Sequence, residues 1–509
     1  MEDVSGAEVH IRISDPFSSL LVSIGQHMNT YSLLESEKSF CFGQKTIEMS
    51  TEIGYTDFEM FSWERFAMLK RKISDVIEQH LKSNSERILL VDGARQVGKT
   101  YIIRYVGKKL FASFIEINML EDSVGNKLFA NATTVDDFYL RISVIAGDKM
   151  KEKENTLIFI DEIQAYPHLL TMLKFLRDDN RFTYIASGSL LGVTLAQTTS
   201  IPMGSIRKIR MFPLDFEEFL YANGMNEFAI SALRKKFEAR ESLDEAMHEK
   251  MMEFFKRYLL VGGLPAAVNA FLDTKNIQAV REIQREIHDY YAADASKYDA
   301  ERKLKIRRIY DQIPSNLENK KKRVVAQRIE DIRGKTFADY EDEFEYLISA
   351  GIALNVQAIS TPVFPLIESS GKNLLKLYLN DVGILTSILY GSNIRAVLDD
   401  ERSVNLGSVY ESVVASELIA HGYNLFYYDN RSKGEVDYLI DDYDSLSAVP
   451  IEVKSGKDYT VHSALNAFMK NKDYHVKKAF VLSNTREITT NGKITYLPIY
   501  DVMFFESTH

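Results

Sequence analysis

The chain of 509 residues is too long for one hydrophobic core and fits about three domains, at roughly 150 residues each. Apolar residues make up 45% and charged residues 26%, a balance that excludes wholesale disorder. The net charge of −10 argues against a protein covered in positive potential for nucleic acid.

Residues 1–62 show no sustained apolar period and are predicted to be an appendage without an assigned fold. The first 60 residues carry ten acidic and three basic side chains, a net charge of −7. The single cysteine, Cys41, cannot form an internal disulfide, and the chain opens without a basic and apolar leader. We therefore expect a cytoplasmic protein that has no membrane span.

Residues 63–213 are predicted to form an α/β core. Apolar positions recur at helical spacing over residues 63–81. Strands are then expected at 87–91, 113–118, 156–160 and 182–186, with a helix beginning at Lys99 after the first strand. Strands that alternate with helices predict a parallel sheet with helices on both faces.

The stretch 93–100 completes a glycine-rich phosphate-binding motif directly after a short apolar strand. Its residues are Gly93, Ala94, Arg95, Gln96, Val97, Gly98, Lys99 and Thr100. A turn that feeds a helix N-terminus offers a phosphate several backbone N–H groups and a favourable dipole. In this pattern Lys99 reaches between the β- and γ-phosphates and the Thr100 hydroxyl holds Mg²⁺. The sequence therefore predicts a site for ATP and Mg²⁺.

A second apolar strand, 157–160, ends in the acids Asp161 and Glu162. The carboxyl edge of a parallel sheet is where ligands bind in α/β folds. We expect Asp161 to bind Mg²⁺ through water and Glu162 to polarise the attacking water. The alternative is an ordinary buried strand that ends in two surface acids.

Three further side chains are candidates for sensing the nucleotide. Ser187 follows the strand 182–186 and could sense the γ-phosphate, or it could belong to a plain Ser/Gly turn. Arg207 and Arg210 are candidates for an arginine finger that reaches a neighbouring subunit in a homo-oligomer. The alternative for both arginines is a solvated surface position.

The second half of the chain is predicted to hold three units. Residues 214–300 are expected to form a helical lid. Residues 301–400 are expected to form helices followed by two strands, 352–359 and 374–380, and this order suits a winged helix. Residues 401–509 are expected to form a smaller α/β unit, with a helix at 409–421 and strands at 424–428, 436–440, 450–453 and 478–482.

Residues 301–335 are locally basic, with twelve Lys or Arg against five Asp or Glu, a net charge of +7. The candidates for phosphate contacts are Lys303, Lys305, Arg307, Arg308, Lys320, Lys321, Lys322 and Arg323. The helix expected at 337–350 carries five acids and is a poor reader of a DNA groove. Contact with nucleic acid is therefore expected from the loop 319–323 and the helix before it; a solvated basic face or a protein-contact module is the alternative.

Four residues of the last unit resemble the site of PD-(D/E)XK nucleases: Glu411, Asp437, Glu452 and Lys454. Glu452 and Lys454 lie two apart on a strand and so share a face. Asp437, Glu452 and Glu411 could hold Mg²⁺ while Lys454 positions or deprotonates water. The alternatives are a surface ion pair, or a nuclease-like fold in which catalysis is lost.

From about residue 65 onward the chain resembles prokaryotic AAA-type ATPases that have a C-terminal domain of unknown function. The matching stretches are 93–100, 158–164, 212–219, 262–265 and 377–383. The resemblance implies ATP binding and hydrolysis, a helical lid that contacts nucleotide near 262–265, and a winged-helix segment.

Our leading hypothesis is a Mg-dependent ATPase switch acting on nucleic acid through 301–335 and the C-terminal unit. The alternative is a nucleotide-gated protein-interaction or signalling module whose C-terminal carboxylates are inert. A metabolic kinase would need an acceptor pocket beside Lys99, for which the sequence has no motif.

Overall fold

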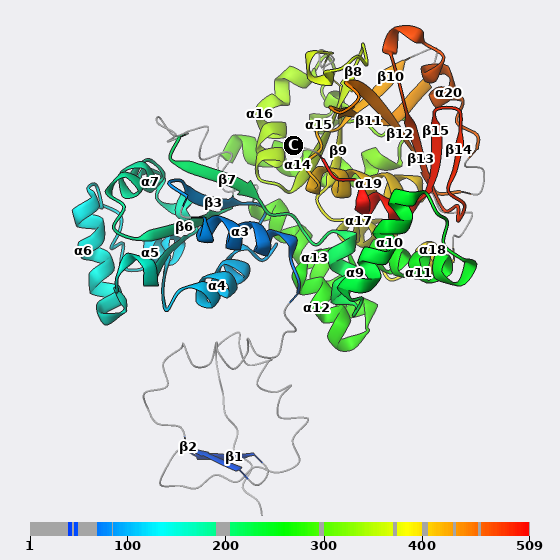
Figure 1. Cartoon of the computed structure of the whole chain (residues 1–509). Helices are drawn as coiled ribbons and strands as arrows, with labels where there is room; N and C mark the ends of the chain where they lie inside the picture. The colour runs from blue at the N-terminus through cyan, green and yellow to red at the C-terminus, as the bar shows by residue number, and fades with distance from the viewer. Residues whose placement is uncertain are drawn as a thin grey trace, which may run out of the picture. The chain divides into compact units, whose positions relative to one another are not determined.

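The computed structural model describes residues 39–42, 45–48, 69–83, 85–189, 204–294, 300–369, 374–399, 406–430, 434–456 and 460–507 (Figure 1). The chain divides into two compact units, Met1–Met68 and Leu69–His509. In the first unit the described residues form an antiparallel hairpin of β1 (Ser39–Phe42) and β2 (Lys45–Glu48). The rest of the predicted appendage, and residues 63–68 of the helix predicted next, lie outside the described residues.

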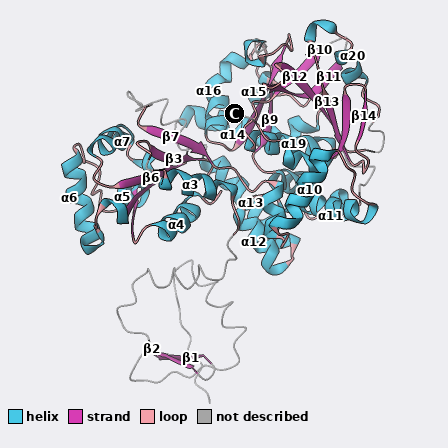
Figure 2. Ribbon diagram, viewed as in Figure 1, coloured by secondary structure: helices cyan, strands magenta, loops and turns pink. Residues whose placement is uncertain are grey.

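The second unit begins with a sheet of five parallel strands in the order β4-β5-β6-β3-β7 (Figure 2). The strands are β3 (Ile88–Asp92), β4 (Ser113–Asn118), β5 (Thr156–Asp161), β6 (Thr183–Gly188) and β7 (Ile206–Arg210). The predicted α/β fold with a parallel sheet is confirmed. β7 was not predicted from the sequence, because three of its five residues are cations and its apolar signal is weak.

Both faces of this sheet are covered because alternate side chains of each strand enter different cores. Leu89 and Val91 of β3 pack in the core that includes α4 (Lys99–Leu110), whereas Ile88 and Leu90 pack in the core that includes α7 (Pro167–Asp179). The other helices of this part are α3 (Lys72–Lys82), α5 (Met119–Val124) and α6 (Val135–Ala146).

The run of helices expected after residue 213 is present. It consists of α9 (Phe216–Ala222), α10 (Glu227–Ala239), α11 (Glu245–Val261), α12 (Pro265–Thr274) and α13 (Ile277–Asp294). Further helices are α14 (Ala300–Glu318), α15 (Ala326–Glu330), α16 (Glu341–Ser349), α17 (Val382–Tyr390), α18 (Arg395–Leu398), α19 (Gly407–Ala420) and α20 (Ser463–Met469). Across the described part of the chain, none of the helices has the length and hydropathy needed to cross a membrane.

A second sheet has eight strands in the order β14-β15-β13-β12-β11-β10-β8-β9, and Figure 1 labels each of them. The strands are β8 (Ala353–Ile359), β9 (Leu375–Leu379), β10 (Phe426–Asn430), β11 (Gly434–Asp442), β12 (Ser447–Lys454), β13 (Ala479–Ser483), β14 (Thr489–Asn491) and β15 (Ile494–Pro498). β8 and β9, the strands expected in the winged helix, form one end of this sheet, because β8 pairs in parallel with β10. The predicted boundary at residue 400 therefore does not separate two sheets.

Candidate functional site

The phosphate-binding loop connects β3 to α4, and both of its glycines have positive φ angles that favour glycine. At Gly93, where φ is +148°, a Cβ would lie 2.3 Å from the Met211 carbonyl oxygen. Gly98 has φ +97° at the N-cap of α4, and a Cβ there would lie 3.6 Å from Pro265 Cγ. Pro265 belongs to the stretch 262–265 expected near the nucleotide. The loop thus turns tightly and points its backbone into the N-terminus of α4.

Lys99 is buried at the start of α4, only 5% exposed. Its Nζ donates to the carbonyl oxygens of Gly93 at 2.9 Å and Ala94 at 2.8 Å. Burial lowers the pKa of Lys99, and the nearby charges of Glu162 and Asp92 oppose that shift. The ammonium group is therefore held inside the loop that a phosphate would enter.

The residues predicted to hold Mg²⁺ lie in contact at the carboxyl edge of the sheet. Thr100 Oγ1 donates to Asp161 Oδ2 at 2.8 Å, and the Ser187 hydroxyl donates to Asp161 Oδ1. Burial raises the pKa of Asp161, while the hydrogen bonds from Ser187 and Thr100 oppose the shift. Three elements, α4, β5 and β6, thus bring their side chains to one point beside the phosphate-binding loop.

Glu162 follows β5 in the left-handed region, with φ +49°. A residue other than glycine in that region stores strain, which is common at functional sites. Glu162 Oε2 accepts hydrogen bonds from Gln164 Nε2 and from Ser189 Oγ, the latter at 3.1 Å. These contacts hold the carboxylate beside the Thr100–Asp161 pair.

The two candidate finger arginines differ in their surroundings. Arg210 forms an ion pair with Asp92 at 3.0 Å and donates to the Ser349 carbonyl at 3.2 Å, so it is engaged within its own chain. Arg207 is exposed and lies opposite Leu89, three residues before the end of β3. Three residues of strand span about 10 Å, so Arg207 does not face the phosphate-binding loop of its own chain.

Residues from distant segments of the chain, which were not predicted from the sequence, surround the phosphate-binding loop. Arg71 donates to the Val97 carbonyl at 3.0 Å, and the Tyr291 hydroxyl to the Arg95 carbonyl at 2.7 Å. A Cβ on Gly351 would lie 3.3 Å from Ala94 N. No local sequence signal marks these contacts, because each is made by tertiary packing.

The four nuclease-like residues are brought together from α19, β11 and β12. Lys454 Nζ lies 2.8 Å from Glu452 Oε1, and Asp437 Oδ2 accepts a hydrogen bond from Val453 N at 2.8 Å. Burial, with Glu452 and Glu411 nearby, raises the pKa of Asp437 well above its usual range. Burial opposes a rise in the pKa of Lys454, but the charges of Glu452 and Asp437 raise it, so Lys454 is a cation.

Two lysines absent from the predicted site also enter this carboxylate cluster. Lys322, from the basic segment, forms an ion pair with Glu411; Lys376 is fully buried, pairs with Glu435 and lies 4.0 Å from Glu411. Each of the three lysines Lys322, Lys376 and Lys454 thus forms an ion pair with one of the three carboxylates of Glu411, Glu435 and Glu452. Among the described residues, no three His, Cys, Asp or Glu side chains are placed to hold a metal ion together.

The side chains of the basic segment 301–335 differ in their exposure and in their ion pairs. Lys303, Arg307, Arg308, Lys320 and Lys321 are exposed, and Lys305 is half-buried. Lys322 and Arg323 face acids instead: Arg323 lies 3.3 Å from Asp429. The loop 319–323 therefore links an exposed basic surface to the carboxylate cluster.

Three family models match the sequence. Residues 85–220 match an AAA domain. This match includes the phosphate-binding loop at 93–100. Residues 252–394 match the domain of unknown function DUF8612, and residues 406–502 match the domain of unknown function DUF4143. The AAA-type P-loop domain predicted from the motifs is thus confirmed, while neither C-terminal match names a winged helix or a nuclease.

Three solved structures match the chain at low sequence identity, each with a TM-score below 0.5. The Walker-type ATPase PABY2304 of Pyrococcus abyssi is 14% identical, with 63% of this chain and 95% of that chain covered and a TM-score of 0.38. The Aeropyrum pernix ORC1 protein in complex with DNA is 14% identical, with 64% and 92% covered and a TM-score of 0.26. The Pif1 helicase from Candida albicans is 16% identical, with 31% and 43% covered and a TM-score of 0.21. No functionally curated protein matches the sequence.

Proposed function

We propose that this protein is a Mg-dependent ATPase that acts as a nucleotide-driven switch. The observation that carries the proposal is the contact between Thr100 and Asp161, 2.8 Å apart, beside a loop whose lysine is buried. A hydroxyl and a carboxylate at this edge are the protein groups that a phosphate-bound Mg²⁺ uses in P-loop enzymes. The residues fit the ion, because all of its protein partners are oxygens.

In this proposal each residue of the site has one role. Backbone N–H groups of 93–98 and the α4 N-terminus bind the β- and γ-phosphates, and Lys99 neutralises their charge. Thr100 and Asp161 hold Mg²⁺, which offsets charge on the phosphate oxygens. Glu162, fixed by Gln164 and Ser189, orients and polarises the attacking water.

The test is ATP hydrolysis with and without Mg²⁺ in the wild type and in Glu162→Gln. We expect Mg-dependent turnover in the wild type, and in the variant ATP binding with turnover reduced by roughly 10²-fold or more. Turnover that is the same in both proteins would contradict the role of Glu162, and no ATP binding by the wild type would contradict the proposed site.

We further propose that the switch acts on nucleic acid through the exposed part of the basic segment. Lys320 and Lys321 are exposed next to Lys322, which contacts the carboxylate cluster, so a phosphate backbone on this surface would pass that cluster. The lysine ion pairs that engage Glu411 and Glu452 favour binding over cleavage. The competing proposal, a protein-interaction module with inert carboxylates, uses the same surface for an acidic protein partner.

Duplex DNA separates the two proposals. We expect DNA to stimulate ATP hydrolysis in the wild type, and Lys320→Glu with Lys321→Glu to abolish the stimulation while basal hydrolysis stays unchanged. The matched control is Lys235→Glu with Lys236→Glu, an exposed lysine pair on α10. Hydrolysis that is indifferent to DNA would support the protein-interaction module instead.

A further inference from the structure

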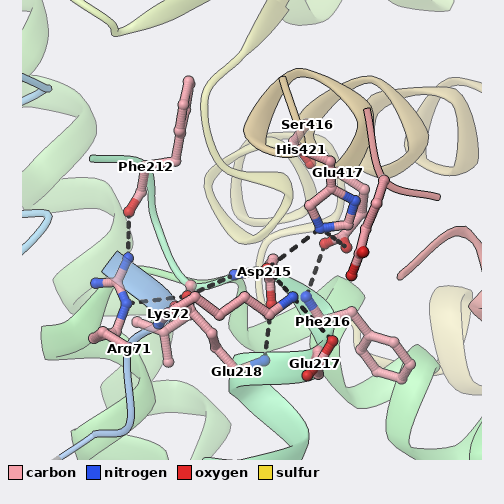
Figure 3. Close-up of polar contacts among 12 residues, drawn as sticks. Arg71, Lys72, Phe212, Asp215, Phe216, Glu217, Glu218, Ser416, Glu417 and His421 are labelled. Carbon is pink, nitrogen blue, oxygen red and sulfur yellow. Dashed lines mark hydrogen bonds and ion pairs between the residues drawn. The ribbon is translucent and has the colours of Figure 1, made fainter. Parts of the chain in front are cut away.

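Three stretches outside the phosphate-binding loop meet in one largely buried group of charges, shown in Figure 3. We name this group the joint. Its members are Arg71, Lys72, Asp215, Glu218, Glu417 and His421. They come from the start of α3, the start of α9 and the end of α19, so the joint connects the ATPase core to a helix of the C-terminal region (Figure 1).

Arg71 is the end of the joint that contacts the phosphate-binding loop. It is 6% exposed, and its guanidinium donates three hydrogen bonds. The acceptors are the Val97 carbonyl at 3.0 Å, the Phe212 carbonyl at 2.6 Å and Glu218 Oε2 at 3.0 Å. A planar guanidinium holds such partners in a fixed arrangement. Val97 therefore cannot shift without disturbing Arg71 or its bond to Glu218.

Glu218 is connected to Asp215 by two hydrogen bonds within the first turn of α9. The Glu218 N–H donates to Asp215 Oδ1 at 2.8 Å, and the Asp215 N–H donates to Glu218 Oε2 at 3.2 Å. This reciprocal capping box fixes the two carboxylates relative to each other. Lys72 adds an ion pair to Asp215 at 2.8 Å.

The other end of the joint lies on α19. Glu417 Oε1 accepts the Phe216 N–H at 2.8 Å, and His421 Nε2 lies 3.3 Å from Asp215 Oδ2 (Figure 3). Glu411 of the carboxylate cluster is six residues before Glu417 on the same helix, about 9 Å along its axis. Displacement of the Asp215 end would therefore move the helix that carries Glu411.

We propose that Arg71 is a positioning residue that transmits the state of the phosphate-binding loop through Glu218 and Asp215 to α19. This relay rests on the proposed binding of ATP at 93–100. Because coupling between two sites is reciprocal, a change at the α19 end must alter ATP affinity, as a change in ATP occupancy must alter α19. A joint that only stabilises the fold would show neither effect.

The experiment is hydrogen exchange of α19 amides with and without Mg-ATP, together with titration of ATP affinity, on the full chain. In the wild type we expect Mg-ATP to slow exchange over 407–420. In Arg71→Gln we expect ATP to bind about fivefold or more weaker, the lower range of allosteric coupling, and the response of α19 to be lost at saturating ATP. In His421→Gln, remote from the loop, we expect ATP affinity to change as well.

The matched control is Arg104→Gln, which breaks another arginine–carboxylate pair of the core, to Glu116 at 2.6 Å. We expect this variant to keep the response of α19. ATP binding without any response of α19 in the wild type, or a full response in Arg71→Gln, would overturn the relay alone. No ATP binding by the wild type would overturn the nucleotide site and the relay with it. Arg71→Lys, which keeps the charge and one of the bonds, serves as a partial rescue.

Discussion

Asp161 lies where three elements meet, and it illustrates how the site is built at the scale of residues. It accepts hydrogen bonds from Thr100, from Ser187 and from the backbone of Glu162. The acid and its neighbour Glu162 could be predicted from the end of an apolar strand. Their donors in α4 and β6 could be placed only because parallel strands end at one edge of a sheet.

Replacement of Lys99 tests the phosphate-binding loop. Lys99→Ala removes the one ammonium group buried in the loop, so we expect ATP affinity to fall by ~10- to 100-fold, consistent with about 1.5–3 kcal/mol for a hydrogen bond to a charged group. Titration with a fluorescent ATP analogue measures this loss. Lys108→Ala, an exposed lysine in the last turn of the same helix, should leave the affinity unchanged; equal loss in both variants would contradict the role of Lys99.

Replacement of Lys322 tests its ion pair with Glu411 in the carboxylate cluster. Lys322→Ala leaves Glu411 without its closest cation, so we expect Mn²⁺, used as a probe for Mg²⁺, to bind at least ~10-fold more tightly, about 1.4 kcal/mol. Electron paramagnetic resonance of free Mn²⁺ measures the affinity. Lys321→Ala, the exposed neighbour, should behave as the wild type. Unchanged Mn²⁺ binding in Lys322→Ala would show that Lys322 does not compete with a metal ion.

At the scale of elements, the N-termini of helices α9, α12 and α17 lie in contact with one another through hydrogen bonds that involve their backbones. Leu214 N donates to the Gly263 carbonyl at 2.7 Å, and Gly263 N donates to Asp381 Oδ2 at 2.6 Å. A Cβ at Gly263 would lie 2.0 Å from the Leu214 carbonyl oxygen. The stretches 212–219, 262–265 and 377–383 therefore form one packing unit.

This contact makes Gly263 intolerant of a side chain. We expect Gly263→Ala to destabilise the second unit by about 3 kcal/mol, because the backbones cannot separate without losing the Leu214 and Asp381 bonds. Thermal unfolding measures the effect. Gly456→Ala, where an added Cβ would meet nothing within 4 Å, is the control. A wild-type melting temperature in Gly263→Ala would contradict the close contact.

The joint also gives the fold a pH dependence. Burial lowers the pKa of His421, but the hydrogen bond to Asp215 and the charges of Asp215 and Glu417 outweigh it and raise the pKa. Burial and the charge of Asp215 raise the pKa of Glu417 to about 7. When the pKa of a group is higher in the folded state than in the unfolded state, the group contributes fully to stability at pH values below its pKa in the unfolded state. That contribution is lost as the pH rises through the pKa of the group in the folded state. The charged groups that act on His421 are Lys72, Asp215 and Glu417. Lys72 also pairs with Glu217, and Glu417 also accepts a hydrogen bond from Tyr258.

We therefore expect the melting temperature of the wild type to fall between pH 5.5 and pH 8, and to fall less in His421→Gln. Asp215 does not contribute in this range, because its pKa is held below its usual value, despite burial, by Lys72 and His421. The control is His248→Gln, since burial lowers the pKa of His248 and its contribution has the opposite sign. Identical pH profiles of the wild type and His421→Gln would contradict a charged His421.

Most elements of the core could be predicted, and the misses have physical causes. Strands such as 156–160 are continuous apolar runs, whereas β7 is Ile-Arg-Lys-Ile-Arg and carries no such signal. The period-two spacing of a strand correctly placed Glu452 and Lys454 on one face. The contacts of Lys322 and Lys376 with Glu411 arise from tertiary packing, which the local sequence does not encode. For the same reason the contacts of Arg71 could not be predicted, because its three partners lie 26 to 147 residues away in the sequence.

At the scale of the molecule, the eight-stranded sheet makes residues 301–509 one structural part. β10 pairs with β8 on one side and β11 on the other, so a cut at residue 400 would expose the backbone edge of β10. We expect the fragment 401–509 to aggregate, and size-exclusion chromatography measures this. The fragment 69–509, cut where the chain divides into its two units, should stay monodisperse and bind ATP. A well-folded monomer of 401–509 would contradict this view of the sheet.

The phosphate-binding loop is enclosed by Arg71, Pro265, Tyr291 and Gly351, which come from four separate parts of the sequence. In genetic terms, the nucleotide function is spread over about half of the reading frame. A random mutagenesis screen for loss of ATP-dependent activity should return alleles at these four codons beside those at 93–100, and suppressors of one such allele should map to the segments of the others.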